Sequence, residues 1–136
     1  MNEIEQQELI EYWKITAEHD YDTMISLFDS KHYSNSLFFG HIVLEKILKA
    51  HVVRVIKKEA PYTHDLVALH KLVGDVPLED SEIDLLDQVN HYNIRTRYPD
   101  YKLKFYKMCT MEYTTENLEK IKQLYAKLCQ QPTLKK

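Results

Sequence analysis

The chain has 136 residues, of which 44% are hydrophobic and 29% are charged. These fractions are typical of a globular protein and exclude disordered, collagen-like and simple repeat proteins. Only two glycines are present, which disfavours a β-sandwich with many tight turns and favours helices. We expect residues 1–136 to form one domain, because this length can bury a sizeable core without a metal or a disulfide.

Charge is distributed unevenly along the chain. Residues 1–30 carry one Lys and eight Asp or Glu, whereas residues 91–136 carry ten Lys or Arg and four Asp or Glu. The basic C-terminal third could attract phosphate groups. It could equally pack against the acidic N-terminal helix of the same or a second subunit.

Cysteine usage and the N-terminal sequence indicate a cytoplasmic location. Cys109 and Cys129 lie far apart in the sequence, and we interpret them as reduced thiols. The first nine residues are polar and acidic, unlike a signal peptide. No apolar run approaches the ~20 residues that span a bilayer.

Two long helices are predicted in the first half of the chain. Apolar residues recur at three- and four-residue steps over residues 3–28, which predicts one helix with one apolar stripe. A second helix is predicted over residues 34–58, with Ser34 as its cap. It is apolar on two faces, which places it either in the centre of a bundle or at a subunit interface.

The second half predicts three further helices. A short one covers residues 65–73, capped by Thr63 and ended by Gly74. A fourth covers residues 82–95, with Asp80 or Ser81 as cap. The last runs to Gln130, with Thr114 or Thr115 as cap, while the periodicity of residues 99–113 is ambiguous. The prediction is an all-α, up-and-down bundle of about five helices, four long and one short.

A polar strip continues the apolar face of the predicted fourth helix. Asn90, Asn93 and Arg97 follow one another at three- and four-residue steps. Buried polar groups need partners, so these residues either connect the helix to a neighbour or line a cleft. Arg95 and Arg97 could bind a phosphate while Tyr92, Tyr98 or Tyr101 stacks on a base. Alternatively, the arginines complement the helix dipole and pair with Asp100.

A second polar strip lies on the predicted second helix. His41, Glu45 and Lys49 are spaced four residues apart, so they share one face. Glu45 and Lys49 have the favourable order for an ion pair within a helix. The strip is either solvated or faces the Arg97 region, where Glu45 could bind that arginine in the core.

Motifs for metal binding and nucleophilic catalysis are missing. None of the seven His follows a Glu at the spacing of di-iron bundles. His64, Asp65 and His70 have no cysteine pair or third histidine at zinc spacing. There is no Gly-x-Ser-x-Gly elbow and no phosphate-binding glycine loop. We therefore predict no catalytic residue, no metal and no cofactor.

Four motifs in order resemble the HEPN domain, a family named for nucleotide binding in higher eukaryotes and prokaryotes. The first is Tyr21-Asp22-Thr23, and the second runs from Ser36-Leu37-Phe38-Phe39-Gly40-His41 into Leu44-Glu45-Lys46-Ile47-Leu48-Lys49-Ala50. The third is Pro61-Tyr62-Thr63-His64-Asp65-Leu66, and the fourth is Arg97-Tyr98-Pro99-Asp100. The resemblance covers residues 12–128 and implies a helical bundle that often dimerises.

The resemblance also divides the possible functions. Family members that look like RNA-cutting toxins carry an Arg and, after four to six residues, a His. None of the three arginines here has a His at those positions. The form Arg-Tyr-Pro-Asp looks more like the branch of small proteins that accompany a nucleotidyltransferase or bind nucleotides. The candidate binding residues are Glu45, Lys49, His64, Asp65, Asn93, Arg95, Arg97 and Tyr98.

Three functions remain as hypotheses. The first is a non-enzymatic, dimeric nucleotide- or RNA-binding module that works with a nucleotidyltransferase partner. In it, Arg97 and Lys49 would contact phosphate, and Tyr98 or Tyr92 would stack on the base. The second is an RNA-cleaving toxin whose proton acceptor is His91 or His64. The third is a structural module without a small ligand, with the second helix as its dimer surface.

Overall fold

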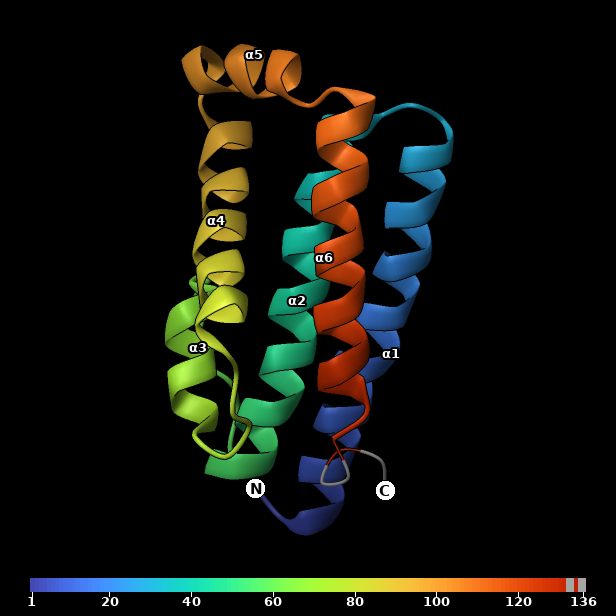
Figure 1. Ribbon diagram of the computed structural model, residues 1–136. Helices are drawn as coiled ribbons and strands as arrows, with labels where there is room; N and C mark the ends of the chain where they lie inside the picture. The colour runs from blue at the N-terminus through green and yellow to red at the C-terminus, as the bar shows by residue number, and fades with distance from the viewer. Residues whose placement is uncertain (132–133, 135–136) are drawn as a thin grey trace.

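The protein is a bundle of α-helices. The computed structural model describes residues 1–131 and Leu134, apart from the side chains of residues 94–97. The helices are α1 (Glu3–Asp29), α2 (Tyr33–Ile56), α3 (Leu66–Val73), α4 (Asp80–Arg97), α5 (Pro99–Met108) and α6 (Met111–Cys129). In Figure 1, α1, α2, α4 and α6 run along the bundle, α3 lies beside α4, and α5 crosses one end. The all-α prediction is confirmed, with six helices among the described residues in place of about five.

The additional helix is α5, in the segment whose periodicity was ambiguous. Tyr98 has extended backbone angles (φ −110°, ψ 123°), and Pro99 occupies the first turn of α5. The residue before a proline avoids the helical region, whereas a proline fits the first turn of a helix. The chain therefore turns sharply at Tyr98. Phe105 is the buried residue that attaches α5 to the bundle.

Several helix starts differ from those predicted. Asp65 caps α3, accepting from the backbone N–H groups of Val67 and Ala68, while Thr63 accepts from the N–H of Asp65. Thr110 caps α6, four or five residues before the predicted caps Thr114 and Thr115. Glu79 caps α4 through a reciprocal capping box with Glu82. In these cases another side chain that can cap a helix lies within a few residues, so composition alone does not select the first turn.

Two other caps test the sequence analysis directly. Gly74 ends α3 in the left-handed conformation, with φ 74°, as predicted. By contrast, α2 begins at Tyr33, and His32 precedes it without a side-chain capping bond. Ser34 therefore lies inside the first turn and is not the cap.

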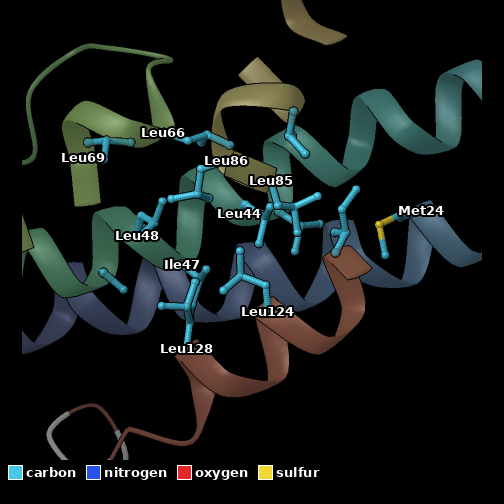
Figure 2. Close-up of a cluster of buried hydrophobic side chains, with 14 of the residues drawn as sticks. Met24, Leu44, Ile47, Leu48, Leu66, Leu69, Leu85, Leu86, Leu124 and Leu128 are labelled. Atoms are coloured by element: carbon cyan, nitrogen blue, oxygen red, sulfur yellow. The ribbon is translucent and has the colours of Figure 1, made fainter. Parts of the chain in front are cut away.

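Helix α2 is the centre of the bundle. It contacts α1, α3, α4, α5 and α6, and most of its residues are buried. Figure 2 shows the core, in which Leu44, Ile47 and Leu48 of α2 lie among leucines from α3, α4 and α6. Most of α2 is thus buried within one chain, as predicted for a helix at the centre of a bundle, whereas Phe38 and Ile42 on its second apolar face are only half-buried.

The packing of α2 against α6 depends on a glycine. A Cβ atom at Gly40 would lie 2.8 Å from Cδ1 of Ile121, closer than carbon atoms approach without a shift. The absence of a side chain at Gly40 therefore lets α2 and α6 approach each other closely.

Hydrogen bonds fasten the other end of α2. Nε2 of His51 donates to the carbonyl oxygen of Leu128 on α6 at 2.9 Å, and Arg54 donates to Nδ1 of the same imidazole at 3.0 Å. Arg54 also forms two bonds of 2.8 Å with the carboxylate of Asp75. His51 is fully buried, and burial lowers its pKa. The imidazole is held neutral with its proton on Nε2.

Across the described helices, we find no segment that is both long and apolar enough to cross a membrane.

Candidate functional site

A buried carboxylate connects α2 to the loop before α3. Glu45 is 9% exposed. Its Oε1 accepts from Nδ1 of His64 at 2.8 Å, and its Oε2 accepts from Nζ of Lys49 at 3.0 Å. Charged groups with such low exposure need partners, and each oxygen of this carboxylate has one. The predicted strip of His41, Glu45 and Lys49 is therefore buried and not solvated.

The two ends of this strip are fixed as well. His41 is 1% exposed, and its Nε2 donates to the backbone oxygen of His64 at 2.8 Å. The ammonium group of Lys49 lies 5.2 Å from the ring centre of Trp13 on α1, a cation–π contact. The imidazole and the backbone of His64 are thus both held by α2, while its side chain keeps 37% exposure.

Asn90 joins α4 to the start of α3. Its side-chain oxygen accepts from the N–H of Leu66 at 2.8 Å, and its nitrogen donates to the carboxylate of Asp65 at 3.0 Å. Of the two interpretations of the polar strip on α4, Asn90 fits a connection to a neighbouring helix. We call Glu45, Lys49, His64, Asp65 and Asn90, together with His41, the α2–α3 cluster.

The structure brings half of the predicted binding residues together. Glu45, Lys49, His64 and Asp65 all belong to the α2–α3 cluster. Asn93 is buried on α4, one turn beyond Asn90. The side chains of Arg95 and Arg97 lie outside the described residues.

Tyr98 belongs to a different surface, where α4 meets α5. It is 56% exposed, and its ring makes an edge-on contact with that of Tyr101, with 6.5 Å between centroids. Lys102, Lys104 and Lys107 are exposed along α5. Among the described residues, no carboxylate forms an ion pair with these lysines. We call Tyr98, Tyr101, Lys102, Lys104 and Lys107 the α5 surface.

Two residues do not fit the roles in the first hypothesis, which were base stacking for Tyr92 and phosphate contact for Lys49. Tyr92 is 1% exposed and packs against Phe105 with 5.1 Å between ring centroids, so it is not accessible to a base. Lys49 is 5% exposed and already binds Glu45. The amphipathic pattern of α2 could not reveal this, because His64, which binds Glu45, and Trp13, which lies against Lys49, belong to other parts of the sequence.

Sequence reasoning missed the exposed Tyr62 beside the cluster. Its side chain is 94% exposed, and its ring lies 5.7 Å from that of His64. The only signal was its place in the motif Pro61-Tyr62-Thr63-His64. His91, by contrast, is exposed on α4, and its Nδ1 donates to the backbone oxygen of Asp87 in its own helix.

The candidate residues do not form a metal site. Over the described part of the chain, no three His, Cys, Asp or Glu side chains are grouped so that they could hold a metal ion. His64 and Asp65 are neighbours, but their side chains bind Glu45 and the N-terminus of α3 respectively.

The bundle, the α2–α3 cluster and the α5 surface define a small helical protein with a candidate binding surface. Comparison with known proteins identifies its family. The model of the HEPN domain matches residues 10–131, so this chain belongs to the HEPN domain family. Its fold is similar to that of TT1696 from Thermus thermophilus, a crystal structure, with a TM-score of 0.73 and 19% identity. The match covers 88% of this chain and 94% of that one. No curated protein matches significantly.

Proposed function

We propose that this HEPN protein is a non-catalytic module that binds a nucleotide or RNA and works with a nucleotidyltransferase partner. The observation that carries the proposal is the α5 surface. Two exposed tyrosines lie beside lysines that lack acidic partners among the described residues. Aromatic rings that stack on bases, together with cations that track the phosphates, are the usual means of binding single-stranded nucleic acid.

The arrangement on α5 supports this use. Tyr98 and Tyr101 lie at the start of the helix, and Lys104 and Lys107 follow on the next turns. Residues three apart on a helix are neighbours on its surface, so one strand can contact Tyr101, Lys104 and Lys107 together. In this proposal the charged groups of the α2–α3 cluster contact no ligand, because they bind one another.

Binding of a fluorescent single-stranded RNA, compared with ATP and GTP, tests the proposal. We expect Tyr98→Ala to weaken RNA binding roughly tenfold, since stacking contributes about 1–3 kcal/mol per base. Leu72→Ala is the control, because Leu72 is also a large exposed apolar side chain, at 44%, but lies on α3. If both variants are folded and bind RNA with equal affinity, the α5 surface is not the binding site.

The partner is tested separately. A nucleotidyltransferase encoded next to this protein should co-elute with it in gel filtration. If the two proteins elute independently at micromolar concentrations, the proposed partner is wrong. The nucleic-acid site is tested only by the RNA-binding assay.

One observation favours RNA cleavage as a second candidate function. Glu45 holds the Nδ1 proton of His64, which leaves Nε2 of a half-exposed imidazole as a proton acceptor. Nε2 would take the proton of a 2′-hydroxyl as its oxygen bonds to phosphorus. The 5′-oxygen would then leave with a proton from water, giving a 2′,3′-cyclic phosphate.

Cleavage of labelled RNA in EDTA tests this candidate. His64→Ala should abolish cyclic-phosphate products, whereas His91→Ala, which changes a histidine bound to its own helix, should retain them. RNA that stays intact with the wild-type protein would rule out cleavage by His64.

A further inference from the structure

An exposed apolar stripe runs along the first half of α1. Ile4, Tyr12 and Ile15 are 71%, 53% and 62% exposed. Together with Gln7, Glu8 and Glu11 they line a shallow hollow that is formed by α1 alone. Large exposed apolar stripes with a polar border mark interaction surfaces, and the border of this one is acidic.

The outer side of α5 has the opposite charge. Leu103 and Tyr106 are 58% and 69% exposed, and the exposed Lys102, Lys104 and Lys107 lie around them. Each surface therefore combines large apolar side chains with charges of one sign.

The two surfaces also match in length. The ten residues of α5 extend over about 15 Å, and Ile4 to Ile15 extend over about 16 Å of α1. Pairing of two α1 stripes would place glutamates together, and pairing of two α5 helices would place lysines together. Both arrangements are repelled, whereas α1 against α5 is attracted.

The complement cannot come from the same chain. Figure 1 shows the N-terminal end of α1 at the opposite end of the bundle from α5. From the charge complementarity we infer that α5 of one copy packs on the α1 stripe of a second copy, with Leu103 and Tyr106 against Ile4, Tyr12 and Ile15. This contact shares Lys104 and Lys107 with the proposed nucleic-acid surface, so the two uses of α5 exclude each other.

Sedimentation velocity of the pure protein over a range of concentrations tests this contact without RNA or a partner. We expect association that weakens with salt. Glu8 lines the hollow, and Glu5 is exposed one turn before Glu8 on α1. Glu5→Lys/Glu8→Lys should raise the dissociation constant at least about tenfold, as should Lys104→Glu/Lys107→Glu. The matched control is Glu18→Lys/Asp22→Lys, which makes the same charge change on exposed residues of α1 beyond the hollow.

Mixing the two charge-reversed proteins provides the decisive comparison. Each reversed α1 then meets a reversed α5, so a mixed complex should form although neither variant associates alone. Circular dichroism confirms that the variants are folded. A wild-type protein that is monomeric at all concentrations would overturn the inference, as would association that the reversals leave unchanged or a mixture that stays monomeric.

Discussion

The Glu45 carboxylate on α2 lies 2.8 Å from Nδ1 of His64, a residue in the loop that leads to α3. This bond spans 19 positions of the sequence and joins the most buried helix to a half-exposed side chain. With Lys49 on its other oxygen, Glu45 fixes both the loop and the ring that faces solvent.

Removing the charge of Glu45 should cost considerable stability. In Glu45→Ala, Lys49 keeps a buried ammonium group without its carboxylate, so we expect a loss of about 3 kcal/mol in the free energy of unfolding. Urea denaturation followed by circular dichroism measures it. Glu45→Met/Lys49→Met should recover part of the loss, whereas a double variant less stable than the single one would contradict this explanation.

Gly40→Ala should destabilise the contact between α2 and α6. The new methyl group meets Cδ1 of Ile121 at 2.8 Å, so the end of this side chain must shift. Overpacking costs about 1–3 kcal/mol, and the higher helix propensity of Ala offsets about 1 kcal/mol of it. The combination Gly40→Ala/Ile121→Val removes that Cδ1 atom and should restore part of the stability. If both variants melt at the same temperature, another contact is responsible.

His51 should make stability depend on pH. Burial lowers its pKa in the native state and outweighs the opposing effect of its bond to Leu128, while the Arg54 charge adds a smaller lowering. Unfolded chains take up the proton near pH 6.5, so the unfolded state binds more protons below this value. Stability should therefore fall as the pH drops below about 6.5.

Denaturation of His51→Gln across the same pH range isolates this contribution. The variant should lose less stability between pH 6.5 and 5 than the wild-type protein does. Parallel curves for the two proteins would assign the pH dependence to other groups.

Asn90→Ala should loosen the start of α3. Asn90 bonds to both the N–H of Leu66 and the carboxylate of Asp65, and a lost pair of such bonds costs about 1–3 kcal/mol. Hydrogen exchange should show faster exchange at Leu66 and little change in α1. Uniformly faster exchange throughout the chain would instead indicate global destabilisation.

Sequence reasoning predicted the helices better than their ends and their partners. The spacing of apolar residues located α1, α2, α4 and α6, since a helix repeats every 3.6 residues whatever it packs against. Gly74 marked the end of α3 because few other residues adopt its backbone angles. Segment 99–108 stayed ambiguous because Phe105 is its only buried residue. A single buried residue cannot show the spacing of an apolar face.

The sequence named candidate residues but did not indicate which of them lie together or which are buried. Glu45 and Lys49 were identified from their motif, and their four-residue spacing correctly implied an ion pair. Whether that pair was solvated depended on the loop of His64, which is distant in sequence. Tyr98 came from a motif of the same family, yet the turn before Pro99 places it on the exposed α5 surface.

The sequence by itself therefore determined the helical class, the family and the charge asymmetry, because these follow from local periodicity, ordered motifs and composition. Only the tertiary structure decided that the strip on α2 is buried, that Asn90 joins α4 to α3, and that the acidic start of α1 and basic α5 lie at opposite ends of the bundle. Burial and pairing depend on which distant segments meet, and that is settled by packing the whole chain around α2.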